Sequence, residues 1–256
     1  MNRIGRPSVA RWVMPLAAAW LMHSSHALAQ ERPDLSGVWR NYGGPSIGGG
    51  QRAGWPQDAP YTEEARRKVA EYQSLVEGTG ETPGGFCVGT GMPGSMLGSG
   101  GYPMEIIQRP EQITIIYEAH TELRRVYMNA EDVDPADLIP TRNGFSTGRW
   151  EGDSLVVETI SLKEAVDQRS AHSEEARIIE RYRLNGENED GRRILTADLT
   201  VIDPKFYNEP VTTTKSWVEA EPDVRMLTYE CTEPEWEEFL EQRREELAGS
   251  RPNGIG

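Results

Sequence analysis

N-G-F-S-T-G-R-W-E-G-D-S-L-V-V-E-T-I, residues Asn143–Ile160, is the stretch that decides the fold. Two extended runs meet in it at Glu151-Gly152, a pair whose glycine accepts the positive φ that a tight hairpin turn needs. In the second run Leu155 and Val157 alternate with their neighbours, as in a strand whose two faces meet different surroundings. The stretch therefore predicts a central β-hairpin.

Further extended runs lie on both sides of this hairpin at short spacing. The clearest alternation of apolar and polar residues is that of Arg192–Asp203. The predicted strands are Leu35–Arg40, Met104–Arg109, Gln112–Glu118, Glu122–Met128, Gly144–Trp150, Ser154–Ile160, Glu175–Leu184, Arg192–Asp203, Val211–Glu219 and Met226–Cys231. About ten antiparallel strands favour closure, because a closed sheet has no exposed edges. We predict an all-β, up-and-down, lipocalin-like barrel, with a two-sheet sandwich as the alternative.

Two helices and one long glycine-rich segment complete the predicted fold. Residues 62–77 have an N-cap at Thr62 and apolar residues at helical spacing, and a second helix is expected to begin near Pro234. Residues 78–103 are too long for an ordinary connection and match no phosphate-binding pattern. We interpret them as an ordered flap over the barrel. Its apolar anchors are Phe86, Met92, Met96, Leu97 and Tyr102.

The first 29 residues have the composition of a secretory signal peptide. Its parts are the basic residues Arg3, Arg6 and Arg11, the apolar run Trp12–Met22, and Ala27-Leu28-Ala29 before Gln30. The apolar run is too short for a stable membrane anchor. We expect cleavage after Ala29 and a periplasmic or secreted protein without membrane insertion. Residues 30–250 are predicted to form a single monomeric domain, followed by a flexible tail over residues 251–256.

The chain is strongly acidic, with 27 basic and 41 acidic residues and a net charge of −14. Cleavage of residues 1–29 removes three arginines and no acidic residue, which leaves a net charge of −17. Nucleic acids and anionic membrane surfaces repel such a protein and are not expected partners.

Cys87 and Cys231 are the only cysteines. An exported protein folds under oxidising conditions, which predicts that these two form a disulfide. Closing so long a loop stabilises a protein by roughly 4–5 kcal/mol in the chain-entropy model. A reactive thiol is the alternative.

Several motifs together resemble a largely uncharacterised family of exported proteobacterial β-rich proteins with the signature G-R-W-E-G-D-[ST]-L-V-V-[DE]-T. The signature lies at Gly148–Thr159, and the other motifs are Ser36-Gly-Val-Trp39, Cys87 before Gly91-Met-Pro93, His172–Arg183 and Thr200–Pro204. The resemblance covers most of the chain after residue 29. It implies an exported, β-rich single domain and carries over no site residues.

His120 and His172 are the only histidines beyond the predicted signal peptide. In an extended run His172 shares one face with Glu180 and Tyr182, so a carboxylate is predicted to orient it as a general base. Asp203, at the end of an apolar strand, is the other candidate partner, although aspartate before proline more often forms a turn. An exposed turn histidine is the alternative for His172, and substituting it is then expected to leave stability nearly unchanged.

Other polar motifs give weaker signals. A metal site of His120, His172 and Glu118 or Glu180 lacks any metal-binding spacing, so we predict no metal and no cofactor. The G-x-S-x-G match at Gly144–Gly148 lies between strands, whereas a hydrolase elbow needs a strand-to-helix turn. The charges of Arg124-Arg125 and Glu180-Arg181 are expected to pair across strands rather than to bind an anionic ligand.

These observations predict an exported β-barrel with an apolar cavity for a small hydrophobic or amphipathic molecule. The predicted chemistry is a cofactor-free isomerisation, cyclisation or elimination, with His172, Glu180 and Asp203 as catalytic residues. A lipocalin-like carrier and a structural envelope protein are the alternatives. The predicted ligand contacts are Tyr182, Trp150, Trp217, Phe86, Met92 and Tyr102.

Overall fold

A computed structural model describes residues 32–42, 54–98, 101–130, 133–232, 240–242 and 244. Its strands are β1 (Gly37–Asn41), β2 (Met104–Gln108), β3 (Gln112–Tyr117), β4 (Glu122–Met128), β5 (Phe145–Glu151), β6 (Ser154–Ile160), β7 (Arg177–Glu187), β8 (Arg193–Ile202) and β9 (Val211–Glu219). Its helices are α1 (Glu63–Val76) and α2 (Gly94–Leu97), with the 3-10 turns η1 (Pro83–Phe86), η2 (Ala119–Thr121) and η3 (Pro135–Asp137). The predicted signal peptide and tail lie outside the described residues.

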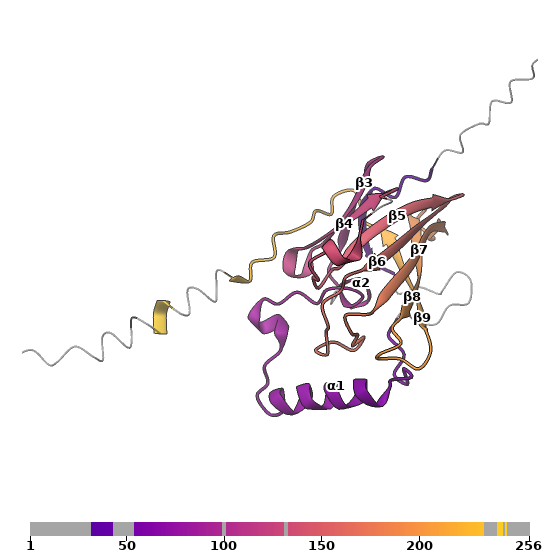
Figure 1. Cartoon of the computed structure of the whole chain (residues 1–256). Helices are drawn as coiled ribbons and strands as arrows, with labels where there is room; N and C mark the ends of the chain where they lie inside the picture. Colours follow the sequence, from indigo (N-terminus) through magenta and orange to yellow (C-terminus); the bar gives the residue numbers. More distant parts are fainter. Residues whose placement is uncertain are drawn as a thin grey trace, which may run out of the picture. The chain divides into compact units, whose positions relative to one another are not determined.

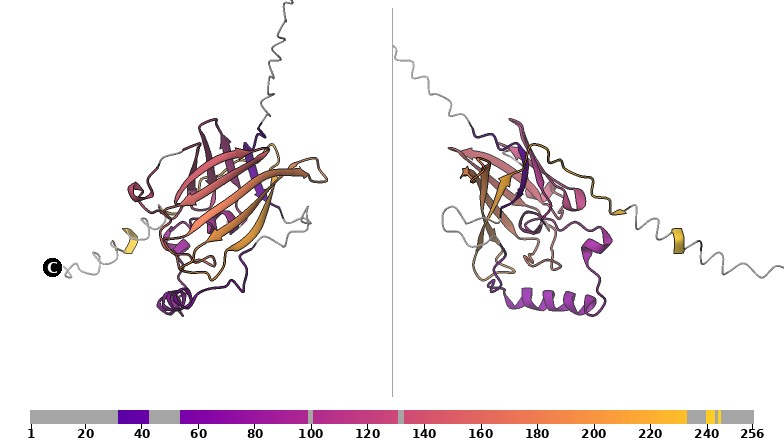
Figure 2. Two further views of the ribbon diagram at one scale, coloured as in Figure 1. Left: turned by 45° about the vertical axis from the view of Figure 1, so that its right-hand side comes forward. Right: turned by 180° about the vertical axis from the view of Figure 1, so that it is seen from behind.

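The strands follow one another around a closed barrel in sequence order, and β9 pairs with β1 to close it. Figure 1 and Figure 2 show the strands curling around a common interior. This arrangement confirms the predicted all-β barrel, with nine strands in the described part of the chain. One neighbouring pair departs from the antiparallel pattern, because β4 and β5 run parallel. A tight hairpin cannot join parallel strands, and β5 begins at Phe145, 17 residues after the end of β4 at Met128.

One predicted strand is wrong. Residues 226–231, which we call the strap, form no strand, although the other strand predictions each correspond to one of β1 to β9. The strap is fixed at two points instead: the Leu227 backbone N–H donates to Glu118 Oε2 over 2.7 Å, and Cys231 is bonded to Cys87. These contacts hold the strap without a neighbouring strand. The helix predicted from Pro234 lies for the most part outside the described residues.

Inward-facing side chains of the strands form the core of the barrel. The apolar face predicted for β8 is observed, since Leu195, Ala197, Leu199 and Val201 are all buried, although Thr196 on the other face is buried as well. Helix α1 lies beyond one end of the barrel in Figure 2, and its predicted N-cap is confirmed because Thr62 Oγ1 accepts from the Ala65 N–H. In the described part of the chain, no helix has the length and apolar character needed to cross a membrane.

The predicted flap does not lie over the barrel as one layer. Residues 91–97, which we call the plug, insert among the strands, and Met92 and Met96 are 0% and 1% exposed. Phe86 and Tyr102, predicted as apolar anchors of the same flap, are 59% and 44% exposed. The barrel therefore takes up only the middle of the glycine-rich segment, where the two methionines fill its interior.

The predicted disulfide is confirmed. Cys87 and Cys231 are bonded across a sequence separation of 144 residues. Because Cys87 directly follows η1, the bond ties the start of the glycine-rich segment to the strap.

Candidate functional site

A buried ion pair lies in the barrel interior. Arg124 of β4 and Glu180 of β7 have side chains that are 1% and 0% exposed. Arg124 Nη1 donates to Glu180 Oε1 over 3.0 Å, and Nη2 donates to the other carboxylate oxygen, so the pairing is bidentate. The predicted cross-strand pairing of these charges is thus observed, although β4 and β7 are not neighbouring strands. Burial by itself lowers the pKa of Arg124, but Glu180 outweighs that effect and raises this pKa above its ordinary value.

Three hydroxyls complete the hydrogen bonds of this pair. Arg124 Nε donates to Ser146 Oγ over 3.0 Å, and Nη2 also donates to Thr159 Oγ1 over 2.7 Å. The Tyr182 hydroxyl donates to Glu180 Oε1 over 3.0 Å. We call these five residues the polar cluster. Ser146 is the serine of the G-x-S-x-G match, and its position inside strand β5 excludes the hydrolase elbow.

Two tyrosine hydroxyls meet the methionines of the plug. Tyr117 Oη lies 4.0 Å from Met92 Sδ, and Tyr182 Oη lies 3.9 Å from Met96 Sδ. A thioether is a weak acceptor, so Met92 satisfies the Tyr117 hydroxyl poorly, whereas the Tyr182 hydroxyl donates its proton to Glu180. Burial raises the pKa of both tyrosines above the ordinary value, and both hydroxyls therefore keep their protons at neutral pH.

The plug is anchored by a second buried carboxylate. Glu122 of β4 accepts the Gly91 backbone N–H over 2.8 Å, and it also accepts the Ser95 hydroxyl. Gly91 has a φ of +73°, and a Cβ there would lie 2.5 Å from the Arg142 carbonyl oxygen. Only glycine fits this position, which fixes where the plug enters the barrel.

His172, the predicted general base, is not paired with Glu180. Its side chain is 1% exposed, so the alternative of an exposed turn histidine is wrong as well. Nδ1 lies 3.1 Å from the Ser170 carbonyl oxygen, which can only accept, while Nε2 is buried without a hydrogen-bond partner. Burial lowers the pKa of His172, against the opposing effects of neighbours that include Asp203 and Asp167. Substituting a side chain this buried will affect stability, contrary to the expectation for a surface residue.

Asp203 acts within its own turn. Its carboxylate accepts the Ser173 backbone N–H over 2.7 Å and the Ser173 hydroxyl over 2.8 Å. It also accepts the backbone N–H groups of Lys205 and Phe206. This is the turn role that aspartate before proline usually has, and it occupies the oxygens that a catalytic role would need.

The structure brings some of the predicted ligand contacts together and separates others. Tyr182, Trp217 and Met92 are all buried in the interior, and the rings of Tyr182 and Trp217 stack with centroids 6.3 Å apart. Trp150 is only partly buried and packs against the edge of the core. Phe86 and Tyr102, being exposed, do not line the interior.

Sequence reasoning missed Lys215 of β9. Its side chain shares the inward face of Trp217, with the nitrogen 5.9 Å from the centre of that ring. No carboxylate within the described ranges pairs with it, and burial lowers its pKa. The parity of Lys215 with Val211 and Trp217 on a predicted strand was the available signal.

His120, the other histidine, lies beside η1, where its ring approaches Gly84. Its ring packs 4.8 Å from that of Tyr229 in the strap, and it lines a cleft of about 190 Å³ together with Arg142 and Asp167. Among the described residues, no three His, Cys, Asp or Glu side chains are grouped so that they could hold a metal ion. The structure therefore does not assemble the metal site considered from the sequence.

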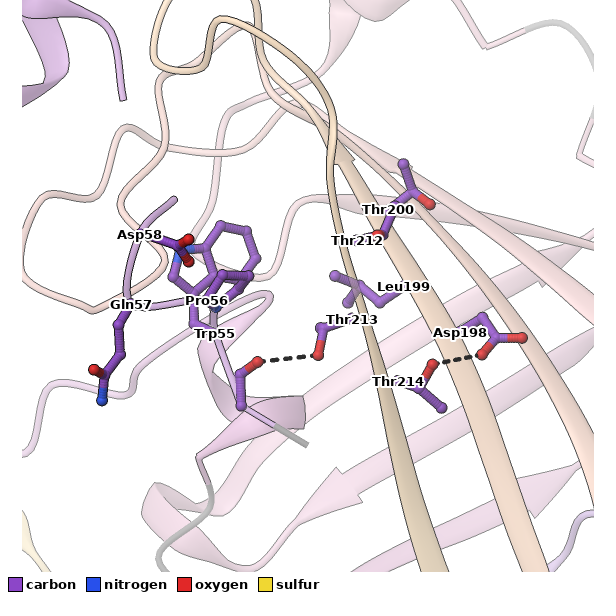
Figure 3. A pocket seen from close by; sticks show the side chains of 11 residues that line it. Trp55, Pro56, Gln57, Asp58, Asp198, Leu199, Thr200, Thr212, Thr213 and Thr214 are labelled. Atoms are coloured by element: carbon purple, nitrogen blue, oxygen red, sulfur yellow. Dashed lines mark hydrogen bonds between the residues drawn. The ribbon is translucent and has the colours of Figure 1, made fainter. Parts of the chain in front are cut away.

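A larger cleft of about 580 Å³ lies between residues 54–58 and the strands β8 and β9 (Figure 3). Two of its threonine hydroxyls are engaged locally: Thr213 donates to the Gly54 carbonyl oxygen, and Thr214 donates to Asp198. None of the predicted site residues lines it. The polar cluster, which is buried and charged, remains the stronger candidate for function.

No protein-family model matches the sequence, and no curated protein is similar to it.

We expect Glu180→Gln to lower the free energy of unfolding by roughly 3–5 kcal/mol, because it leaves the Arg124 charge buried without its partner. The double variant Arg124→Met, Glu180→Leu should lose much less than the sum of its single changes. Urea unfolding of the parent, Arg124→Met, Glu180→Leu and the double variant measures this coupling. Glu151→Gln is the matched control, because its ion pairs are exposed, and it should change little. Equal effects of the two glutamate substitutions would contradict the account of a buried pair.

We also expect the stability of the protein to fall between pH 7.5 and pH 5.5, in part because of His172. Its folded pKa lies below the unfolded value of about 6.5, so the unfolded chain binds the proton more readily. The stability contributed by the neutral ring is present above that value and is lost as the pH falls. His172→Gln should lose less stability than the parent over this range in urea unfolding, and an unchanged difference between the two pH values would exclude this role.

Proposed function

We propose that the protein is an exported binding protein for a small hydrophobic or amphipathic organic molecule, in the manner of a lipocalin-like carrier. The ligand would lie inside the barrel, with its polar end against the polar cluster and its body in the space that the plug now fills. The observation that carries this proposal is the buried Tyr117 hydroxyl, whose acceptor is the Met92 sulfur at 4.0 Å. The nearby Tyr182 hydroxyl donates to Glu180 and lies 3.9 Å from the Met96 sulfur. A ligand oxygen is a better acceptor for the Tyr117 hydroxyl than a thioether.

The plug is suited to being displaced. Methionine side chains are unbranched and adapt to different surroundings, so Met92 and Met96 can repack at small cost. The disulfide at Cys87 keeps the start of the glycine-rich segment attached to the strap while the plug moves. Apolar walls with a few convergent polar groups are the usual composition of a site for a small organic ligand.

Catalysis is the second candidate function, and the contact between Tyr182 and Glu180 favours it. A carboxylate beside a protonated tyrosine in an apolar interior provides an acid and a base for an isomerisation, cyclisation or elimination. Glu180 is, however, already bound by both terminal guanidinium nitrogens of Arg124, Nη1 and Nη2. Both of its oxygens are thereby engaged, so binding is the function that the geometry supports better.

Export is part of the proposal and rests on the composition of residues 1–29 and on the disulfide. Intact-mass measurement of unreduced protein from the exported fraction should give a chain that begins at Gln30. Its mass should rise by that of two hydrogens on reduction, as the Cys87–Cys231 bond opens. A full-length chain retained in the cytoplasm would contradict export.

Ligand binding can be measured with the neutral fluorescent probe N-phenyl-1-naphthylamine. We expect saturable binding to the mature protein and roughly tenfold tighter binding to Met96→Ala, since about 1.4 kcal/mol of added contact is a factor of ten. The space freed beside the Tyr182 hydroxyl is the physical reason. Ile139→Ala is the control, because Ile139 is 85% exposed, and it should bind like the parent. Absence of saturable binding in both the parent and Met96→Ala would refute the proposal.

A further inference from the structure

We infer that the opening of the binding site is the seam between β4 and β5, and that its ligand is an amphipathic anion such as a carboxylate with an apolar body. This inference rests on the proposed function and adds the class of ligand and the route by which it enters.

The seam is a gap in the hydrogen bonding of the barrel wall. Strand β4 pairs with β3 along Glu122–Tyr127, but it pairs with β5 only over Val126–Met128. The edge of Glu122–Arg125 that faces β5 therefore has no partner strand. Residues 141–144 would continue β5 along this edge, but Thr141 exchanges backbone hydrogen bonds with Ser161 and Lys163 instead. The wall opens at this point because Thr141 is bonded to Ser161 and Lys163, which follow β6, and not to β4.

A cleft of about 340 Å³ occupies the gap. It combines apolar and basic side chains and contains no acidic residue. Its lining residues are Leu123, Arg124, Arg125, Tyr127, Thr141, Arg142, Asn143, Gly144 and Phe145. The rings of Tyr127 and Phe145 stack across the seam with centroids 5.2 Å apart, and Leu123 is 41% exposed. Apolar surface beside basic groups suits a ligand that has both an apolar body and an anionic group.

The charges of the cleft are not balanced within it. Arg124 is paired with Glu180 and Arg142 with Asp167, but the exposed Arg125 has no ion pair with any residue of the described ranges. An uncompensated cation in a chain of net charge −14 attracts anions to one place on an otherwise repelling surface. Asn143 adds a buried Oδ1 atom without a hydrogen-bond partner, which a hydroxyl or amide N–H of a ligand can satisfy.

The seam also connects with the interior. Arg124 lines the cleft, and its guanidinium binds Glu180 inside the barrel. This residue therefore links the cleft with the polar cluster. The plug is attached to both sides of the seam: Gly91 N–H donates to Glu122, and Met92 N–H donates to the Arg142 carbonyl oxygen over 2.9 Å. A ligand entering here therefore meets the anchors of the plug first, and its apolar body follows where Met92 lies.

The test compares decanoate with 1-decanol as competitors of N-phenyl-1-naphthylamine in the mature protein. The two competitors share the apolar chain and differ in charge. Arg125→Gln should weaken displacement by decanoate roughly tenfold and leave displacement by 1-decanol unchanged, because it removes only the charge. Added sodium chloride should weaken the displacement of the probe by decanoate in the parent but not in Arg125→Gln. Arg109→Gln is the matched control, since Arg109 is exposed and lies outside the cleft, and it should change neither competitor.

The outcomes separate this inference from the proposed function. If decanoate and 1-decanol both displace the probe and Arg125→Gln affects neither, the inference that the seam is the opening is overturned. The proposal that the barrel binds a small molecule then still stands. If Arg125→Gln weakens both competitors equally, the anion preference is overturned. If the probe itself does not bind, the proposed function fails, and the seam inference fails with it.

Discussion

The bidentate pairing of Arg124 with Glu180 is the constraint on which the interior of this barrel depends. Two charges removed from water cost several kcal/mol each, and their attraction repays that cost only when the remaining hydrogen-bonding groups are satisfied. Ser146, Thr159 and Tyr182 supply those groups from three further positions on the wall. Because replacing such a pair by apolar residues is often neutral or stabilising, stability alone does not account for it. The ligand recognition that we propose gives the pair a role beyond stability.

The parallel pairing of β4 and β5 involves the strand that carries Arg124. An antiparallel hairpin after β4 would continue the hydrogen bonds of the wall along the whole strand. The longer connection leaves the Glu122–Arg125 edge unpaired, and that edge carries both Arg124 and the anchor of the plug. This irregularity in the sheet is where we infer that a ligand enters, while the rest of the barrel stays closed.

Local sequence patterns predicted the strands of the barrel well, but they predicted the side-chain contacts and the plug in its interior poorly. Gly152 and the alternation in β8 are short-range signals, and both gave the observed elements. The partner of Glu180 comes from a strand across the barrel, and strand parity does not identify it. Parity indicates only the face of the strand to which a side chain points. Parity placed Tyr182 beside Glu180 correctly, but it paired His172 with the same carboxylate because it treated residues before β7 as part of the strand. The plug was misplaced because its glycines have no periodicity, and its burial depends on space that only the closed barrel defines.

The contacts of the plug favour binding over catalysis. In a permanently filled core, buried hydroxyls are expected to have good oxygen or nitrogen partners. The Tyr117 hydroxyl instead meets the Met92 thioether of the plug, while Glu180 is bound by Arg124 and by the Tyr182 hydroxyl. The poorly satisfied group is therefore the Tyr117 donor rather than the carboxylate. A site with such a donor and an engaged carboxylate is suited to holding an oxygen of a ligand, and it reaches proton transfer only if that ligand first draws Arg124 away from Glu180.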